Sequence, residues 1–261
     1  MLLRYERKYL VPNALMDALR KRLITFVVPD NFTSVNEKGI SQYTVRSIYY
    51  DTHDLVSYYE KFNGIMLRRK FRIRGYDDYY KGCKVVFEIK RKIENRTRKH
   101  RAFMQYDDID EIFQTGDVEK YVVKDKKYKS GVEDAKRFFF HAVKYQLIPT
   151  VLIVYEREAY QGKFDTDIRI TFDKNIRSRM YPQISDLYSN DNLKYLFDSH
   201  FILEIKYYEG DMSIWARSLV EEFSLLLEAL SKYTTSIDVN QYRPFVGFDV
   251  SKSRTFSTQL I

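Results

Sequence analysis

Basic side chains recur at every second position in one short segment of the sequence. Between residues 67 and 74 the even positions hold Arg68, Lys70, Arg72 and Arg74. The positions between them include the apolar residues Phe71 and Ile73. Arginine binds phosphate oxygens through two parallel N–H bonds, and lysine offers a compact point charge. Such a row is therefore suited to holding linked phosphate groups.

Carboxylates stand among the basic residues in other segments with the same spacing of two. Glu204 and Lys206 alternate near the end of the chain. The other sets are Arg4, Glu6 and Lys8, and Lys84, Glu88, Lys90 and Lys92. A divalent cation in a phosphate site is held by carboxylate and phosphate oxygens together. These carboxylates therefore indicate a metal-assisted phosphate site.

Two interpretations of the basic rows differ in what neutralises their charge. A solvated outer face fits any single row, but such faces usually mix both signs, because like charges on neighbouring strands repel. Several rows that are nearly all basic require a polyanion to neutralise them. Apolar residues alternate with the basic ones, which favours an enclosed basic face. A nucleic-acid surface would instead place the cations on a solvent-facing patch with aromatic residues interleaved.

The rows require strands, because the side chains of a strand alternate between its two faces. Segments rich in β-branched and aromatic residues predict strands near residues 4–11, 43–50, 66–76, 83–92, 96–104, 150–160, 168–173 and 200–207. Helical spacing of apolar residues predicts helices near residues 12–23, 54–62, 132–147 and 211–232. The last of these carries a stripe formed by Trp215, Leu219, Phe223, Leu226 and Leu230.

Many strands with few helices between them predict an α+β protein. We expect a closed, or at least strongly curved, antiparallel β-barrel with helices packed outside. Closure removes the edge strands that so many strands would otherwise create. The chain contains only nine Gly and five Pro and shows no obvious linker, so residues 1–261 are expected to form a single domain.

Composition limits the possible partners without selecting one. The chain has 44 Lys and Arg against 36 Asp and Glu, a formal net charge of +8, which suits nucleic acids, membrane surfaces or phosphorylated small molecules. No stretch reaches the roughly 18 apolar residues of a membrane span, so no span is expected. The lone Cys83 excludes an internal disulfide framework and fits a reducing, cytoplasmic location.

Motifs in a fixed order along the chain carry a resemblance to a known family. They are RYERKYLV at 4–11, SIYYDT at 47–52, LRRKFRIRGY at 67–76, FEIKRK at 87–92, YEREAY at 155–160, IRITFD at 168–173, LEIKY at 203–207 and LSKY at 230–233. The sequence resembles the VTC-type polyphosphate polymerase domain, a branch of the CYTH-like triphosphate-tunnel metalloenzymes. The resemblance implies a tunnel of about eight antiparallel strands, whose inward basic residues hold a triphosphate or polyphosphate chain.

The resemblance also implies roles for individual residues of this sequence. The cations implied in catalysis are Lys8, Arg72, Arg74, Lys90 and Arg157. Further phosphate contacts are implied at Lys92, Lys99, Arg101, Tyr155, Lys206, Ser231 and Lys232. The register of the strand near 96–104 is not fixed by the sequence, so it stays open which of Lys99 and Arg101 belongs to this set. Glu204 is implied as the main ligand of Mn²⁺ or Mg²⁺, with help from Glu6 or Glu88.

The implied reaction transfers the γ-phosphoryl group of ATP to the end of a polyphosphate chain. Two alternatives stay open: hydrolysis of tripolyphosphate or nucleoside triphosphates in the same tunnel, and a non-catalytic polyphosphate-binding module. Glu204 beside Lys206 favours catalysis, because a pure polyanion receptor gains nothing from a carboxylate that repels its ligand. In the wider superfamily, the first strand carries two Glu at alternate positions, followed by a Lys. Here Arg4 takes the first of those places, which favours phosphate binding over metal binding.

Overall fold

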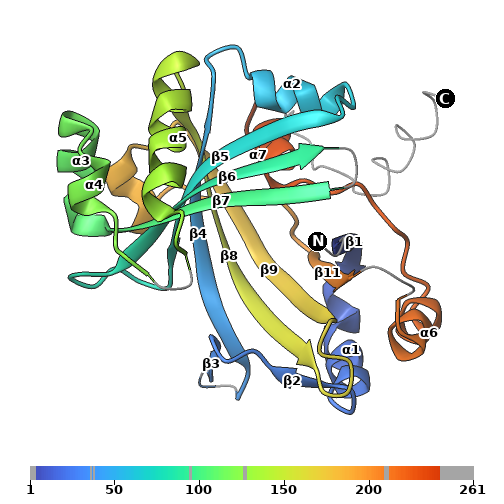
Figure 1. Cartoon of the computed structure of the whole chain (residues 1–261). Helices are drawn as coiled ribbons and strands as arrows, with labels where there is room; N and C mark the ends of the chain where they lie inside the picture. Colours follow the sequence, from blue (N-terminus) through green and yellow to red (C-terminus); the bar gives the residue numbers. More distant parts are fainter. Residues whose placement is uncertain are drawn as a thin grey trace.

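The fold is α+β and is built around one curved antiparallel sheet (Figure 1). The structure, a computed structural model, describes residues 4–35, 37, 39–93, 96–125, 128–208 and 212–241. Its strands are β1 Arg4–Pro12, β2 Val27–Pro29, β3 Ser34–Val35, β4 Ser41–Asp51, β5 Leu67–Tyr76, β6 Lys84–Ile93, β7 Arg96–Gln105, β8 Ile148–Gly162, β9 Arg169–Met180, β10 Lys194–Tyr195 and β11 His200–Tyr208. Its α-helices are α1 Met16–Leu23, α2 Val56–Phe62, α3 Ile109–Thr115, α4 Val118–Tyr121, α5 Gly131–Lys144, α6 Ile214–Glu222 and α7 Lys232–Gln241.

The main strands follow the order β1-β11-β9-β8-β4-β5-β6-β7, and the short β2, β3 and β10 attach at the sides. In Figure 1, β5, β6 and β7 cross the molecule above the long strands β4, β8 and β9. Within the described residues no backbone pairing joins β7 to β1, so hydrogen bonds do not complete the expected closed barrel. The sheet is strongly curved, and the ion pair between Lys90 of β6 and Glu6 of β1 (3.7 Å) spans the gap between its two ends.

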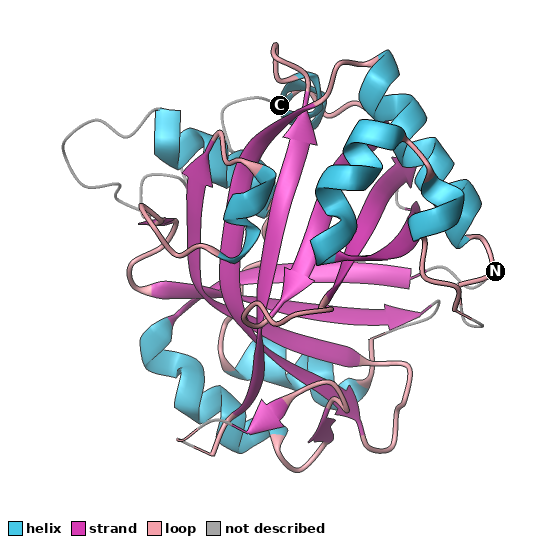
Figure 2. Cartoon of the chain, turned by 90° about the vertical axis from the view of Figure 1, so that its left-hand side faces the viewer, coloured by secondary structure: helices cyan, strands magenta, loops and turns pink. Residues whose placement is uncertain are grey.

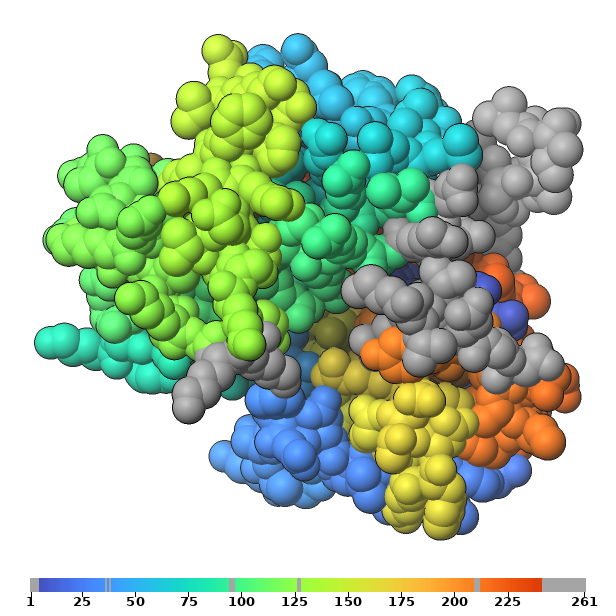
Figure 3. All heavy atoms as spheres, in the orientation of Figure 1, coloured from blue at the N-terminus to red at the C-terminus, as the bar shows by residue number. Residues whose placement is uncertain are grey.

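Apolar packing covers the outer faces of the sheet. Behind β5, β6 and β7, Phe138 of α5 contacts the rings of Phe71 and Phe87 edge to face. This contact belongs to a core cluster that also includes residues of α3 and α4. Behind β1, β9 and β11, a second cluster takes in Leu19 of α1 and Leu219 of α6. Figure 2 shows helices on the outside of the strands, and in Figure 3 the residues of α3, α4 and α5, coloured green to yellow-green, form the left-hand part of the surface. The basic faces of the strands are therefore left for the interior.

Helix α7 lies against the inner side of the sheet and is tied to α2 by one buried carboxylate. Asp51, at the end of β4, is fully buried and accepts hydrogen bonds from the backbone N–H groups of Ser57 (2.9 Å) and Tyr58 (3.1 Å). The Tyr233 hydroxyl of α7 also donates to Asp51. Tyr58 in turn donates to Asp238 of α7 (2.6 Å). These bonds fix the first turn of α7 relative to α2.

Replacing Asp51 with Ala should lower the free energy of unfolding by about 3 kcal/mol or more. The substitution leaves two buried backbone N–H groups and a buried hydroxyl without their hydrogen-bond acceptor, and unsatisfied buried donors lower stability. Urea denaturation measures the change. Asp54→Ala is the matched control, because the Asp54 side chain is 93% exposed and should change stability by no more than about 0.5 kcal/mol. Equal losses in the two variants would contradict the role of Asp51.

The strands predicted from alternation are all present, with bounds that differ by a few residues at their ends; β9 is the one that extends furthest beyond its prediction. The predicted long helix over 211–232 is wrong. Helix α6 ends at Glu222, and Ser224 follows with a left-handed φ of 48° that breaks the helix. The chain then runs along β1, where the Glu228 N–H donates to the Lys8 carbonyl (2.9 Å). For the segment after Ser224, hydrogen bonding to the edge of β1 therefore replaces the expected continuation of the helix.

Among the described residues, no helix combines the length and the apolar character that crossing a bilayer requires.

Candidate functional site

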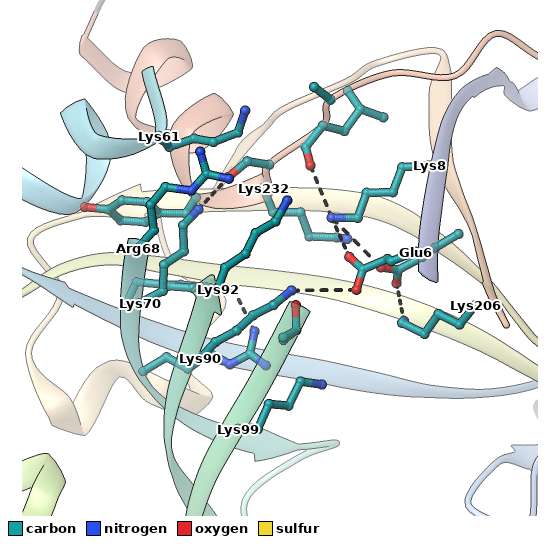
Figure 4. Close-up of a pocket in the computed structure, with 18 of the residues that line it drawn as sticks. Glu6, Lys8, Lys61, Arg68, Lys70, Lys90, Lys92, Lys99, Lys206 and Lys232 are labelled. Atoms are coloured by element: carbon teal, nitrogen blue, oxygen red, sulfur yellow. Dashed lines mark hydrogen bonds and ion pairs between the residues drawn. The ribbon is translucent and has the colours of Figure 1, made fainter. Parts of the chain in front are cut away.

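The inward faces of the strands surround a cavity of about 350 Å³ (Figure 4). Its lining is dominated by cations from strands that are distant in the sequence. The basic lining residues are Lys8, Lys61, Arg68, Lys70, Arg72, Arg74, Lys90, Lys92, Lys99, Arg157, Lys206 and Lys232. The acidic ones are Glu6, Glu204 and Glu228, and the tyrosines are Tyr5, Tyr49, Tyr155 and Tyr233. We call this space the basic cavity.

One wall of the basic cavity is a ladder formed by β5, β6 and β7. Strand register places Arg68 opposite Lys92, and Lys92 opposite Thr97. The next row is Lys70, Lys90 and Lys99, and the row after it is Arg72, Glu88 and Arg101. Successive rows lie about 7 Å apart, because a strand rises about 3.4 Å per residue. The wall therefore presents cations at regular intervals along its length.

The opposite wall carries two neighbouring carboxylates. Register pairs Lys8 of β1 with Glu204 of β11, and Glu6 with Lys206. Lys8 forms an ion pair with Glu6 (2.9 Å), and Lys206 forms one with Glu204 (2.5 Å). Burial acts to raise the pKa of Glu204, but the adjacent ammonium groups of Lys206 and Lys8 outweigh it and hold that pKa well below the ordinary value. Glu204 is therefore ionised, as a metal ligand must be.

Glu6 completes this acidic pair. Burial and the adjacent Glu204 carboxylate act to raise its pKa, and Lys8 and Lys90 reverse the effect, so that the pKa of Glu6 is lowered. In the described part of the chain no group of three or more His, Cys, Asp or Glu side chains is arranged to hold a metal. Two ionised carboxylates nevertheless fit Mg²⁺ or Mn²⁺, because these ions in phosphate sites take one or two carboxylates and fill the remaining positions with phosphate oxygens and water.

A third, fully buried carboxylate supports two of the cations. Arg157 donates to Asp173 through Nε (2.6 Å) and Nη2 (2.8 Å), and Lys232 Nζ lies 2.5 Å from the same carboxylate. Burial acts to raise the pKa of Asp173, but Arg157 and Lys232 lower it to about 2. Asp173 therefore holds the two cations in place at neutral pH. The sequence prediction did not include it, because it neighbours no basic residue at a spacing of two.

Glu88 occupies a supporting position rather than the lining. It is buried and forms ion pairs with Arg72 and with Arg101 Nε (2.8 Å). Glu88 thus has other partners than Glu6 and Glu204, and neither Glu88 nor Arg101 is among the residues that line the cavity. Lys99 is the member of β7 that lines the cavity. On the outer face, the His100 ring contacts Asp134 of α5 (2.8 Å).

The start of α7 closes one side of the cavity. The Ser231 hydroxyl, just before the helix, accepts from Lys70 Nζ (2.8 Å) and from the Thr234 N–H (3.4 Å). The N-terminus of a helix carries a partial positive charge, which adds to the basic potential. Lys70 also lies over the Tyr233 ring, 5.0 Å from its centroid. Ser231 and Lys232 reach the cavity because the bonds of Asp51 fix the first turn of α7.

Comparison with known proteins now gives the family. The sequence profile described as VTC domain matches residues 3–240. The chain belongs to the VTC domain family. The resemblance inferred from the motifs is therefore confirmed. The comparison with curated proteins gives no match.

Two solved structures are similar to this VTC domain at low sequence identity. HpAC1 from Hippeastrum, described as a candidate adenylyl cyclase with a dominant triphosphatase activity, is 11% identical with a TM-score of 0.48, covering 91% of this chain and 96% of its own. PH1819 from Pyrococcus horikoshii OT3 is 12% identical with a TM-score of 0.44, covering 90% of this chain and 98% of its own.

The VTC domain brings together most of the residues predicted from its sequence. All of the predicted catalytic cations line the basic cavity, as do Lys92, Lys99, Tyr155, Lys206, Ser231 and Lys232. Glu204 and Glu6 line it as well, whereas Glu88 and Arg101 support it from outside the lining. Residues that the prediction did not assign to the site include Lys61, Arg68, Lys70, Tyr49, Tyr233 and Asp173. The alternation along β5 already marked Arg68 and Lys70, but nothing in the sequence marked Lys61 of α2.

Proposed function

We propose that this VTC domain is a phosphotransferase that moves the γ-phosphoryl group of ATP onto a polyphosphate chain held in the basic cavity. The observation that supports it is the convergence of cations from β1, β5, β6, β7, β8 and β11 around two ionised carboxylates. The cavity would be the tunnel implied by the sequence, with side chains bridging the open edge of the sheet. A chain of linked phosphates is the ligand class that matches so many cations in rows.

The chemistry of phosphoryl transfer suits this set of residues. The transferred group needs in-line positioning and neutralisation of its charge more than it needs covalent help from the protein. Arg72, Arg74 and Arg157 present planar guanidinium groups for the equatorial oxygens. The attacking oxygen of a polyphosphate end is already ionised at neutral pH, so no strong general base is required. Among the residues that line the cavity, none is a histidine.

Glu204 and Glu6 would hold the divalent cation. When bound, such an ion neutralises charge on the phosphate oxygens and favours departure of the nucleoside diphosphate. Lys206 and Lys8 now pair with these carboxylates, and both are long enough to turn towards phosphate when a metal takes their place. The protein's part is to keep both carboxylates ionised and adjacent.

Product analysis tests the proposal. The purified protein is incubated with ATP and Mn²⁺, and polyphosphate, ADP and orthophosphate are quantified separately. Polyphosphate formed together with ADP supports the phosphotransferase. Orthophosphate without polyphosphate would assign the cavity to hydrolysis of triphosphates. Tight polyphosphate binding without any product would indicate a non-catalytic polyphosphate-binding module.

The affinity for long-chain polyphosphate should fall as the pH rises through a range below the ordinary titration of lysine. Burial, reinforced by Lys90, Lys8 and Lys61, lowers the pKa of Lys70 well below its usual value. A bound phosphate chain favours the ammonium form, so binding takes up a proton wherever free Lys70 has lost one. Calorimetric titration in buffers of different ionisation enthalpy measures this uptake. Lys70→Arg keeps its charge and should remove that part of the pH dependence; identical proton uptake in both proteins would contradict the prediction.

A further inference from the structure

A second group of cations lies on the outer face of the sheet, on the side of β5 and β6 that faces away from the basic cavity. Strand register sets Arg69 of β5 directly opposite Arg91 of β6, and side chains at these odd positions point away from the even positions that line the cavity. Helix α5 packs across the same outer face (Figure 1). It adds Arg137, His141 and Lys144. We call these five residues the outer basic cluster.

The ring of Tyr145, which follows α5 directly, contacts three members of the outer basic cluster. It stacks on the His141 ring, with the centroids 5.5 Å apart and the planes at 10° to each other. Its hydroxyl accepts a hydrogen bond from Arg69 Nη1 (3.3 Å), and Lys144 Nζ lies 5.7 Å from its centroid. The His141 ring also lies 5.6 Å from that of Phe71 on β5. Contacts between α5 and β5 therefore hold the cluster in place in the absence of a ligand.

The outer basic cluster carries positive charge that no ion pair balances within the described part of the chain. Arg69 bonds to a neutral hydroxyl, and the Glu60 carboxylate acts on Arg69 only from beyond ion-pair distance. Two nitrogen atoms of the cluster, Arg91 Nε and His141 Nδ1, are buried and have no hydrogen-bond partner among the described residues. Like charges placed opposite each other on neighbouring strands repel, so Arg69 and Arg91 destabilise the face that carries them.

The titration of His141 reports the same excess of positive charge. Burial lowers the pKa of the His141 ring, and so does repulsion from the four cations of the cluster, Arg69, Lys144, Arg137 and Arg91. These cations come from two strands and a helix, yet all of them are close enough to act on one imidazole. Unpaired cations and unsatisfied buried nitrogen atoms around one point are the groups that a bound anion stabilises.

We infer that the outer basic cluster is a binding site for a phosphate monoester or a similar small phosphate, separate from the basic cavity. Arg69 and Arg91 offer guanidinium groups from the sheet, and Arg137 and Lys144 add charge from α5. Four cations exceed what one carboxylate neutralises, whereas a phosphate monoester carries close to two negative charges and three acceptor oxygens. A soluble phosphate compound and a lipid headgroup both supply this chemistry. The inference is independent of the proposed function, because it concerns the opposite face of β5 and β6.

The His141 ring distinguishes binding at this cluster from binding in the basic cavity. Its signal, assigned with a His141→Gln variant, is followed by NMR during titration with inorganic pyrophosphate, without metal and at constant ionic strength. A bound anion should raise the pKa of His141, because it neutralises the cations that lower that pKa. Lipid binding is measured by co-sedimentation with phosphatidylcholine vesicles that contain or lack phosphatidic acid, whose headgroup is a phosphate monoester.

The test variant is Arg137→Gln/Lys144→Gln, in which both substituted side chains are exposed on α5 and glutamine is compatible with a helix. Its affinity for the bound phosphate should fall about tenfold or more, because each substitution removes a charge-assisted contact. The matched control is Lys21→Gln/Arg217→Gln, which removes one Lys and one Arg at exposed positions of α1 and α6. The control should bind as the wild type does. Thermal unfolding verifies that both variants are folded.

Two outcomes support the inference and identify the source of the phosphate. A response of His141 to pyrophosphate that the test variant weakens would identify a soluble phosphate compound. Sedimentation that requires phosphatidic acid and that the test variant weakens would identify a lipid headgroup.

Three outcomes overturn the inference. The first is a His141 signal that pyrophosphate leaves unchanged, together with equal sedimentation of the wild type and the test variant. The second is an equal loss of binding in the control, which would show general electrostatics rather than a site. The third is a stronger response of His141 to polyglutamate than to pyrophosphate at the same concentration of negative charge, which would assign the cluster to acidic polypeptides.

Discussion

The Arg72→Ala variant is expected to lose at least about a hundredfold in phosphoryl transfer, since removal of one preorganised charged donor from a buried site has effects of this size. Arg72 is buried and donates to the Tyr49 hydroxyl (2.7 Å), and its guanidinium pairs with Glu88. These contacts use two of its five N–H donors and fix its orientation. Arg72 lines the basic cavity together with Arg74 and Lys90, which supply the neighbouring charges.

Two controls separate this role from a loss of folding. Arg72→Lys keeps the charge and the partner for Glu88 but loses the planar fork, so it should retain part of the activity. Arg98→Ala removes an arginine from the outer face of β7 and should retain nearly all of it. Initial rates of ADP release at saturating ATP and Mn²⁺ give the comparison. Wild-type rates in a folded Arg72→Ala protein would rule out the assigned role.

The second large effect is expected for Glu204→Gln, which should abolish the dependence of the rate on Mn²⁺ while preserving phosphate binding. The amide is isosteric with the carboxylate but carries no charge for the metal. Loss of a metal that stabilises transferred charge corresponds to several kcal/mol, and hence to about a thousandfold in rate. Phosphate affinity should hold or rise, because Lys206 and Lys8 are freed from a carboxylate partner.

Glu222→Gln is the matched control for this variant. Glu222 lies on α6, is about half exposed, and pairs with Arg22 at 2.7 Å, away from the cavity. The Glu222→Gln substitution changes the net charge by the same amount as Glu204→Gln. The Mn²⁺ dependence of the activity of this control variant should therefore coincide with that of the wild type. If Glu204→Gln shows an unshifted Mn²⁺ titration and a normal rate, the metal is not held by Glu204.

Alternation in the sequence was sufficient to place much of the wall of the cavity. Phe71 and Ile73 are buried behind β5 while Arg72 and Arg74 line the interior, as the period of two predicts. The same reasoning placed Glu204 inside and Ile205 in the outer core. Residues on a strand whose two faces differ strongly in polarity can be assigned before a structure is known, because a slip of one residue would bury every charge in the apolar core.

Other features depend on contacts that the local sequence does not contain. The role of Asp173 as the partner of Arg157 follows from the register between β8 and β9. In the same way, the role of Glu88 as the partner of Arg72 follows from the register between β5 and β6. Lys61 enters the cavity because Asp51 fixes α2 near α7, which is a relation between distant segments. The stripe from Trp215 to Leu230 suggested one helix, but Ser224 breaks it and the free edge of β1 binds the segment that follows.

A crystal structure with tripolyphosphate and Mn²⁺ tests the central claim most directly. The account predicts phosphate oxygens within hydrogen-bonding distance of Arg72, Arg74 and Arg157 inside the basic cavity. It also predicts anomalous scattering from Mn²⁺ between Glu204 and the bound phosphates. An anion seated on the outer surface of the sheet, or a metal bound away from both Glu204 and Glu6, would contradict it.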